Sequence, residues 1–119
     1  MASDSFSFEH DAMGFVEIFG LIAATEVADV MLKSANIHVK SVCNADAGLI
    51  TVVCTGDLAA CKAAVDAGKA AGTRLGALIG SNLIGRPLAD TVELISGHAG
   101  SMFHIATAPA AKLAKGKKK

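Results

Sequence analysis

The stretch IHVKSVCNADAGLITVVCT, residues 37 to 55, decides the fold of this chain. Residues 37 to 43 alternate between apolar and polar side chains, which is typical of a strand with one covered face. Residues 49 to 55 form an almost continuous β-branched run, which is typical of a strand covered on both faces. Between them lies the short segment NADAG, residues 44 to 48, with Asp46 at its centre. The stretch therefore predicts a β-hairpin whose turn carries one carboxylate.

A strand and a helix are expected before this hairpin, the strand over residues 13 to 19, where MGFVEIF alternates. Residues 21 to 35 predict a helix, because their apolar positions share one face. Those positions are Leu21, Ala24, Val27, Ala28, Met31 and Leu32. On the opposite face Asp29 and Lys33 are four residues apart, in the order that favours an ion pair. Asn36 is expected to end this helix in a left-handed conformation.

A second helix is expected after the hairpin, over residues 58 to 76. Asp57 directly precedes it and is a favourable N-cap residue. The positions expected to be buried are Leu58, Cys61, Ala64 and Val65. Gly68 and Gly72 lie one above the other on this helix, where they would let another backbone come close.

Residues 77 to 85 predict a last strand, interrupted at Gly80, and residues 88 to 96 predict a short helix. The order β-α-β-β-α-β is that of the ferredoxin-like fold. We therefore expect an α+β domain with an antiparallel four-stranded sheet and two helices on one face. Many unrelated functions share this fold, so the fold alone does not decide function. The predicted boundaries are 1–11 for a flexible N-terminal arm, 12–95 for the domain and 96–119 for a disordered basic tail.

Composition narrows the classes of protein that fit. The 119 residues suffice for one domain. Hydrophobic residues make up 52% of the chain, but many are alanine, and Trp and Tyr are absent. Because such a core is thin, we expect further burial between copies of the chain. Five lysines lie in the last eight residues, and the rest carries six basic against eleven acidic residues, which argues against a nucleic-acid-binding face.

Neither a targeting segment nor a membrane span is expected from the sequence. The first residues, MASDSFSFEHD, lack the basic and apolar regions of a signal peptide. No window of the sequence approaches about 18 uninterrupted apolar residues. Three cysteines without a CxxC pair predict no disulfide framework. We therefore expect a cytoplasmic protein with no membrane partner.

No cluster of residues in the sequence predicts catalysis, a cofactor or a metal site. The four histidines are scattered, at His10, His38, His98 and His104. No glycine-rich phosphate-binding signature stands before a predicted helix. Cys43, beside the turn, keeps one alternative open, in which it holds a redox centre on a symmetry axis. A second alternative is a small metabolite-binding regulator of lower oligomeric state, which its ligand would stabilise.

Three segments of the chain are similar, in combination, to one known family. They are MGFVEIFGLIAATEVADVMLKSANI at 13 to 37, AGLITVVCTGDLAACKAAVDAG at 47 to 68 and LIGRPL at 83 to 88. Their motifs are Gly-Phe-Val-Glu in a strand, Lys-Ser-Ala-Asn at a helix end, Gly-Asp at a helix start and a final Arg-Pro. On these motifs the chain resembles the single-domain, hexamer-forming shell proteins of bacterial microcompartments.

The resemblance implies a structural protein rather than an enzyme, without a cofactor. Such proteins form cyclic hexamers that tile edge to edge, with other shell proteins, into the facets of a shell around enzymes. Small metabolites cross a pore on the six-fold axis. The resemblance places the pore lining at Asn44, Ala45, Asp46, Ala47 and Gly48, and the hexamer edge at Lys33, Asn36 and Arg86. It also makes the basic tail a candidate contact for encapsulated enzymes.

Two interpretations of Asp46 stay open. Asp adopts a left-handed turn conformation more readily than most residues. In a hexamer, six Asp46 carboxylates would instead make the pore negative and favour cations and neutral solutes over anions. The chain also departs from the family at Thr55, where Arg is common, and at Gly85 and Leu88, which replace the Pro and His of Pro-Arg-Pro-His. These departures are expected to weaken edge contacts, and the encapsulated pathway is not encoded in any motif.

Overall fold

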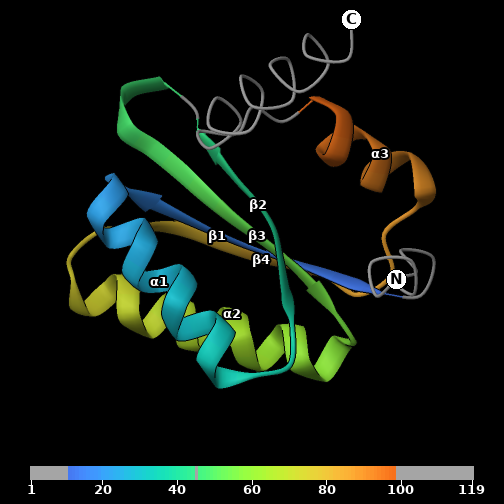
Figure 1. The fold of residues 1–119 in the computed structure, drawn as a ribbon, viewed down its shortest axis with the longest axis horizontal. Coiled ribbons are helices and arrows are strands. Elements are labelled where there is room, and N and C mark those ends of the chain that lie inside the picture. The colour runs from blue at the N-terminus through green and yellow to red at the C-terminus, as the bar shows by residue number, and fades with distance from the viewer. Residues whose placement is uncertain (1–10, 45, 99–119) are drawn as a thin grey trace, which may run out of the picture.

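The computed structural model of the chain describes residues 11–44 and 46–98, and for residues 40–44, 46 and 96–98 it describes the backbone alone (Figure 1). The elements in chain order are β1 (Ala12–Phe19), α1 (Leu21–Ser34), β2 (His38–Asn44), the 3-10 turn η2 (Asp46–Gly48), β3 (Leu49–Gly56), α2 (Leu58–Arg74), β4 (Leu78–Ile84) and α3 (Ala89–His98). The predicted arm lies outside the described residues apart from Asp11. The predicted tail lies outside them beyond His98, where α3 ends.

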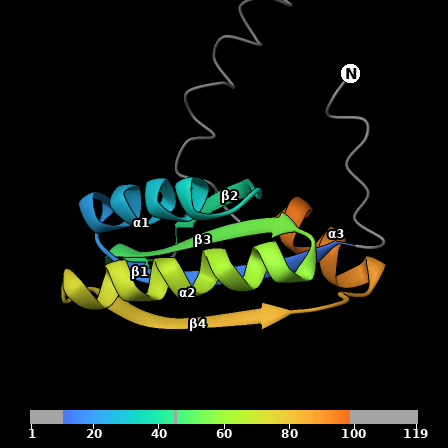
Figure 2. The same ribbon diagram turned by 90° about the horizontal axis from the view of Figure 1, so that it is seen from below.

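The four strands form one sheet in the order β2-β3-β1-β4, and every neighbouring pair is antiparallel. This order places β2, the return strand of the first unit, beyond β3, as the ferredoxin-like arrangement requires. The helices α1 and α2 lie side by side on one face of the sheet (Figure 2). The predicted fold class is therefore confirmed.

The third helix, α3, lies on the opposite face of the sheet. Alternate residues of β1 point to opposite faces, and Val16 and Ile18 belong to the main core, which also contains the buried residues of α1 and α2. Met13 instead packs with Val53 and with Val92 of α3 in a separate small cluster. The short helix predicted after the last strand thus exists, and it covers one end of the second face.

The buried stripe of α1 is narrower than predicted. Ala24, Val27 and Met31 are buried, as expected from their spacing. Leu21 and Leu32 are each 49% exposed, so their predicted burial is wrong within one chain. The reason is geometric, because a helix on a sheet buries only the stripe that faces the strands and its neighbouring helix.

The end of α1 also differs from the prediction. Ala35, not Asn36, follows the helix, and its φ of −159° is extended rather than left-handed. The amide N–H of Ile37 donates to the carbonyl of Ala35 at 3.0 Å. The chain therefore turns directly into β2, and the left-handed conformation predicted for Asn36 is wrong.

The start of α2 confirms the predicted cap. Asp57 accepts a hydrogen bond from the amide N–H of Ala60 at its Oδ1 atom, over 2.8 Å. Cys61, Ala64 and Val65 are buried as expected, whereas Leu58 in the first turn is 52% exposed. The prediction for Leu58 is wrong: its side chain lies beside Gly85, the residue after the end of β4, rather than in the core.

Gly68 and Gly72 of α2 leave space for side chains of neighbouring elements, not for another backbone. A Cβ atom on Gly68 would lie 2.9 Å from Cγ and Sδ of Met31. A Cβ atom on Gly72 would lie 2.8 Å from Cδ1 of Ile18. The sequence predicted the approach of another backbone, whereas the atoms nearest to both glycines are side-chain atoms of core residues.

The strand β4 contains a β-bulge next to Gly80, the residue at which the sequence predicted an interruption of the strand. The pair Glu17–Gly80 is followed by the pair Ile18–Leu78, so Ile79 is the extra residue of a bulge. Ile79 is 53% exposed. The bulge lies in an edge strand, where bulges are common.

Candidate functional site

The turn between β2 and β3 is a single 3-10 turn with two left-handed residues. Ala47 has φ 68° and ψ 24°, and Gly48 has φ 83°. The left-handed position occupied by a residue with a side chain is thus Ala47, and the turn-conformation interpretation of Asp46 finds no support. Ala45 lies outside the described residues, and the structure describes Asn44 and Asp46 by their backbone alone.

The turn is joined to the start of α1 by a main-chain hydrogen bond. The amide N–H of Gly20 donates to the carbonyl of Gly48 at 2.8 Å. One residue earlier, the amide N–H of Phe19 donates to the carbonyl of Ala77 at 2.9 Å. The turn is therefore fixed to the same end of the sheet at which β1 ends and β4 begins.

Phe19 is a residue of this site that the sequence did not single out. A Cβ atom on Gly48 would lie 3.3 Å from Cε1 of the Phe19 ring, so the ring lies directly against the turn. The side chain is 57% exposed. The alternation of apolar and polar residues predicted only that Phe19 belongs to a strand. Its position directly before Gly20 was the one signal in the sequence that it lies at the end of that strand.

The predicted edge residues lie at the end of the sheet opposite the turn. The register pairs Phe19 with Leu49 next to the turn, and Met13 with Ile84 at the other end. Arg86 follows Ile84 by two residues, and Lys33 stands in the last turn of α1, just before β2 begins. The fold thus separates the predicted pore residues from the predicted edge residues (Figure 1).

Lys33 is paired within its own helix. Its Nζ atom lies 2.8 Å from Oδ2 of Asp29, which confirms the predicted ion pair. The hydrogen bond to Asp29, together with its charge, raises the pKa of Lys33. The lysine side chain remains 75% exposed. Asn36 and Arg86 are also exposed, so all three predicted edge residues stand at the surface.

The three departures from the family pattern have different surroundings. Thr55 is fully buried on β3, between the register positions of Met13 and His38, and its hydroxyl has no hydrogen-bond partner in the part of the chain that the structure describes. Its substitution for Arg thus falls inside the protomer. Gly85 has ordinary room for a side chain, and Leu88 is 75% exposed. Gly85 and Leu88 are therefore accessible to a neighbouring molecule.

The protomer exposes many large apolar side chains. Among the described residues they are Phe19, Leu21, Ile22, Leu32, Leu58, Leu75, Ile79, Leu88 and Leu94. Ile22 is 89% exposed. A wide hollow of about 650 Å³ lies over the start of α1 and the end of α2, lined by Leu21, Ile22, Thr25, Glu26, Asp29 and Leu75. Exposed apolar surface of this kind is typical of an interaction face.

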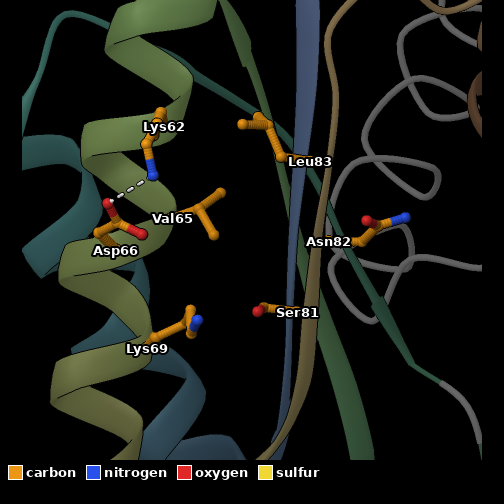
Figure 3. Close-up of a pocket in the computed structure, with 7 residues that line it drawn as sticks. All are labelled: Lys62, Val65, Asp66, Lys69, Ser81, Asn82 and Leu83. Carbon is orange, nitrogen blue, oxygen red and sulfur yellow. Dashed lines mark hydrogen bonds and ion pairs between the residues drawn. The ribbon is translucent and has the colours of Figure 1, made fainter.

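A second hollow lies between α2 and the edge strand β4 (Figure 3). Its lining residues are Lys62, Val65, Asp66, Lys69, Ser81, Asn82 and Leu83. Its volume of about 200 Å³ falls below the range of typical small-molecule sites. Lys62 pairs with Asp66 at 3.3 Å across its rim. This hollow gives no support to the alternative of a metabolite-binding regulator.

The structure describes no site for metal or nucleophilic chemistry. Within residues 11–44 and 46–98, no group of three or more His, Cys, Asp or Glu side chains could hold a metal ion. Cys54 and Cys61 are buried, and the thiol of Cys61 is within hydrogen-bond distance of two main-chain carbonyl oxygens, at 3.5 Å from Ala12 and 3.6 Å from Gly56. Burial, with the neighbouring Cys54, raises the pKa of Cys61 to about 12, and burial also raises the pKa of Cys54. Cys43 is described only by its backbone, which pairs with Thr51.

The fold and site define a small α+β domain with exposed apolar side chains, a fixed turn at one end and exposed basic residues at the other. The BMC domain matches residues 12–87, so the chain belongs to the BMC family, whose members are bacterial microcompartment shell proteins. The resemblance stated from the motifs is thereby confirmed. No helix among the described residues is long and apolar enough to cross a membrane.

Individual relatives carry the same description. The shell protein EutK of Salmonella typhimurium is 49% identical over 89 residues, which are 75% of this chain and 54% of the relative. EutM of Escherichia coli K12 is 43% identical over 71% of this chain and 87% of the relative. PduA of Citrobacter freundii is 41% identical over 73% of this chain and 94% of the relative. The chain thus spans about half the length of the EutK relatives and nearly all of PduA.

A solved structure supports the fold independently. The crystal structure of a microcompartment protein from Desulfitobacterium hafniense DCB aligns with a TM-score of 0.65 at 26% identity. The alignment covers 72% of this chain and 47% of that one. The three relatives described above are each named as a bacterial microcompartment shell protein.

Proposed function

We propose that this chain is a structural tile of a bacterial microcompartment shell. It forms a cyclic hexamer, joins itself and other shell proteins at its edges, and admits small metabolites through a central pore. The observation that carries the proposal is the placement of the β2–β3 turn and of Lys33 and Arg86 at opposite ends of a BMC domain. One end can then face the six-fold axis while the other faces a neighbouring hexamer.

The lateral surfaces of the protomer support a ring. One side of the sheet ends in β2 with α1 near it, and the other ends in β4 with α2 near it. A cyclic interface joins two different surfaces of identical chains. Exposed apolar residues such as Ile22 and Ile79 on these elements would be covered by a neighbouring copy.

The turn supports a pore of small aperture. Ala47 and Gly48 have short side chains or none, so the main chain itself would approach the axis. The pore lining we propose comprises Asn44, Ala45, Asp46, Ala47 and Gly48. Six copies of Asp46 would make it negative, favouring cations and neutral polar solutes over anions.

The edges and the tail complete the proposal. Lys33, Asn36 and Arg86 would contact the neighbouring tile, with Leu88 in place of the histidine common in the family. Residues 96–119, beyond the domain proper, would contact encapsulated enzymes through their lysines.

The solution mass of the purified protein tests this proposal, followed by electron microscopy of the concentrated sample. A mass six times the 12.0 kDa of the chain is expected, with assembly into sheets or tubes. A discrete hexamer that never forms sheets would remove the edge assignment but leave the pore. A monomer, dimer or trimer at micromolar concentration would contradict the tile altogether.

A further inference from the structure

The residues at the tip of the β2–β3 turn contain no large apolar side chain that could fix the turn to the sheet. They are Asn, Ala, Asp, Ala and Gly. A segment with so little apolar area gains little from burial. The sheet holds the ends of the turn, because Asn44 pairs with Ile50 and Leu49 pairs with Phe19. Beyond these strand pairs the structure describes two groups that contact the turn, the amide of Gly20 and the ring of Phe19.

The hydrogen bond alone leaves the turn incompletely fixed. A single N–H···O contact from Gly20 to Gly48 sets one distance but allows the turn to tilt about it. The Phe19 ring restricts this tilt, because it lies beside Gly48. Three of its atoms would lie 3.3, 3.7 and 3.8 Å from a Cβ atom on Gly48. A phenyl ring has only two side-chain torsions, so it forms a rigid wall at low entropic cost.

We propose that Phe19 is the positioning residue of the pore: its ring holds the β2–β3 turn at a fixed height and tilt, and thereby sets the aperture. This inference rests on the pore proposed above. Phe19 does not itself have to line the opening, because it acts through Gly48. Its 57% exposure in one protomer means that burial in the core does not explain its presence at this position.

The contact can be tested on the tile alone with a double-mutant cycle. Gly48→Ala should destabilise the protein for two reasons, the left-handed φ of +83° and the ring 3.3 Å away. Gly76→Ala is the matched control, because Gly76 has φ +68° and nothing within 4 Å of its Cβ position. In a Phe19→Ala background, the effect of Gly48→Ala should fall to that of Gly76→Ala.

The cycle has a defined threshold. The coupling between Phe19→Ala and Gly48→Ala should be at least about threefold in the unfolding equilibrium constant, because contacting residues are not additive. All variants are compared at one protein concentration, since assembly contributes to apparent stability. Additive effects within error would overturn the proposal, whatever the oligomeric state.

A permeation assay separates positioning from a merely structural role. Closed shells containing a fluorescent reporter protein are exposed to iodide or caesium ions, which quench fluorescence on contact. Phe19→Leu should change the influx rates of both ions by a similar factor, because it alters the aperture and not the charge. Phe15→Leu is the control, since Phe15 lies on the same strand and face but packs against the small cluster beneath α3. Its influx rates should equal those of the unmodified protein.

Asp46→Asn distinguishes failure of this inference from failure of the pore itself. It should change the ratio of caesium to iodide influx. If Asp46→Asn shifts this ratio while Phe19→Leu leaves both rates unchanged, the positioning role is wrong and the pore remains. If neither variant changes any rate, the pore is wrong and the role of Phe19 falls with it.

Discussion

Single residues in this chain were predictable where their effect is local. Asp57 could be recognised as a cap because capping needs only a carboxylate and the next turn of backbone. The left-handed conformation predicted for Asn36 was wrong because a helix can also end in an extended residue, as α1 does at Ala35. Phe19 could not be recognised, since its partner Gly48 is 29 positions away in the sequence and the contact depends on the strand register.

The buried thiols of Cys54 and Cys61 make the folded chain less stable at alkaline pH. The pKa of Cys61 is raised from 9.0 to about 12 in the folded chain, chiefly by burial. The unfolded chain therefore releases this proton at lower pH than the folded one, and its contribution to stability is complete below pH 9 and is lost as the pH rises toward 12. We expect the melting temperature to fall across this range.

Cys61→Ala should make that decline less steep, even though it lowers stability at neutral pH by removing buried volume. The measurement is the melting temperature at several pH values between 8 and about 11, a window that covers the shift toward the raised pKa. A decline equally steep in both proteins would contradict the thiol's contribution. Native labelling at pH 8 provides a second check, in which Cys54 and Cys61 should react only after unfolding.

At the level of elements, strands and helices followed from periodicity, but the contacts between helices did not. The four-residue spacing of Gly68 and Gly72 indicated the close approach of another backbone, and side chains lie there instead. What the spacing could not tell is what approaches, because Met31 and Ile18 belong to other elements. The exposed leucines at the ends of α1 and α2 were misassigned for the same reason, since burial at a helix end depends on where the sheet stops.

Gly68→Ala should destabilise the packing of α1 on α2. The new methyl group would lie 2.9 Å from Met31, which is fully buried, and overpacking of this kind costs about 1–3 kcal/mol. This outweighs the gain of about 0.5–1 kcal/mol from replacing glycine within a helix. We expect a net loss of unfolding free energy, measured by denaturation at fixed protein concentration.

Most of this effect should disappear when the side chain of Met31 is removed. In a Met31→Ala background the two contacts at 2.9 Å are removed and the methyl group of Val16, at 3.3 Å, remains close, so the loss caused by Gly68→Ala should become much smaller. A loss of the same size in both backgrounds would mean that the glycine serves the helix itself rather than its contact with α1.

For the whole molecule, the motifs predicted the fold class and the family, and both are confirmed. Assembly is harder to read from one chain, because Lys33 looks like any exposed lysine at a helix end and is satisfied by Asp29 in the protomer. Only its position at the end of the sheet opposite the β2–β3 turn distinguishes it. Sequence cannot supply that position without the register of all four strands.

Lys33→Ala should leave hexamers intact but reduce their assembly into sheets. The reason is that Lys33 is exposed and its partner lies in its own helix, so the protomer loses no core contact. Hexamer content is measured by solution mass and sheet formation by electron microscopy. Lys62→Ala is the matched control, because Lys62 is also an exposed lysine paired with an aspartate one turn away.

The control should form sheets like the unmodified protein, since Lys62 is not one of the three proposed edge residues. Equal sheet formation by both variants would remove Lys33 from the edge. Loss of hexamers in the Lys33 variant would instead assign this lysine to the interface within the ring.

The anchoring of the β2–β3 turn has a consequence for how such tiles diversify. The described anchors are Gly20, Phe19 and Gly48, and none of them is at positions 44 to 47. Positions 44 to 46 can therefore mutate while the framework that carries them stays intact, whereas position 47 has to keep a residue that tolerates a φ of 68°. A lineage of such proteins can exchange the chemistry of its opening by drift at a few codons, and an engineer can graft a new selectivity there without redesigning the scaffold.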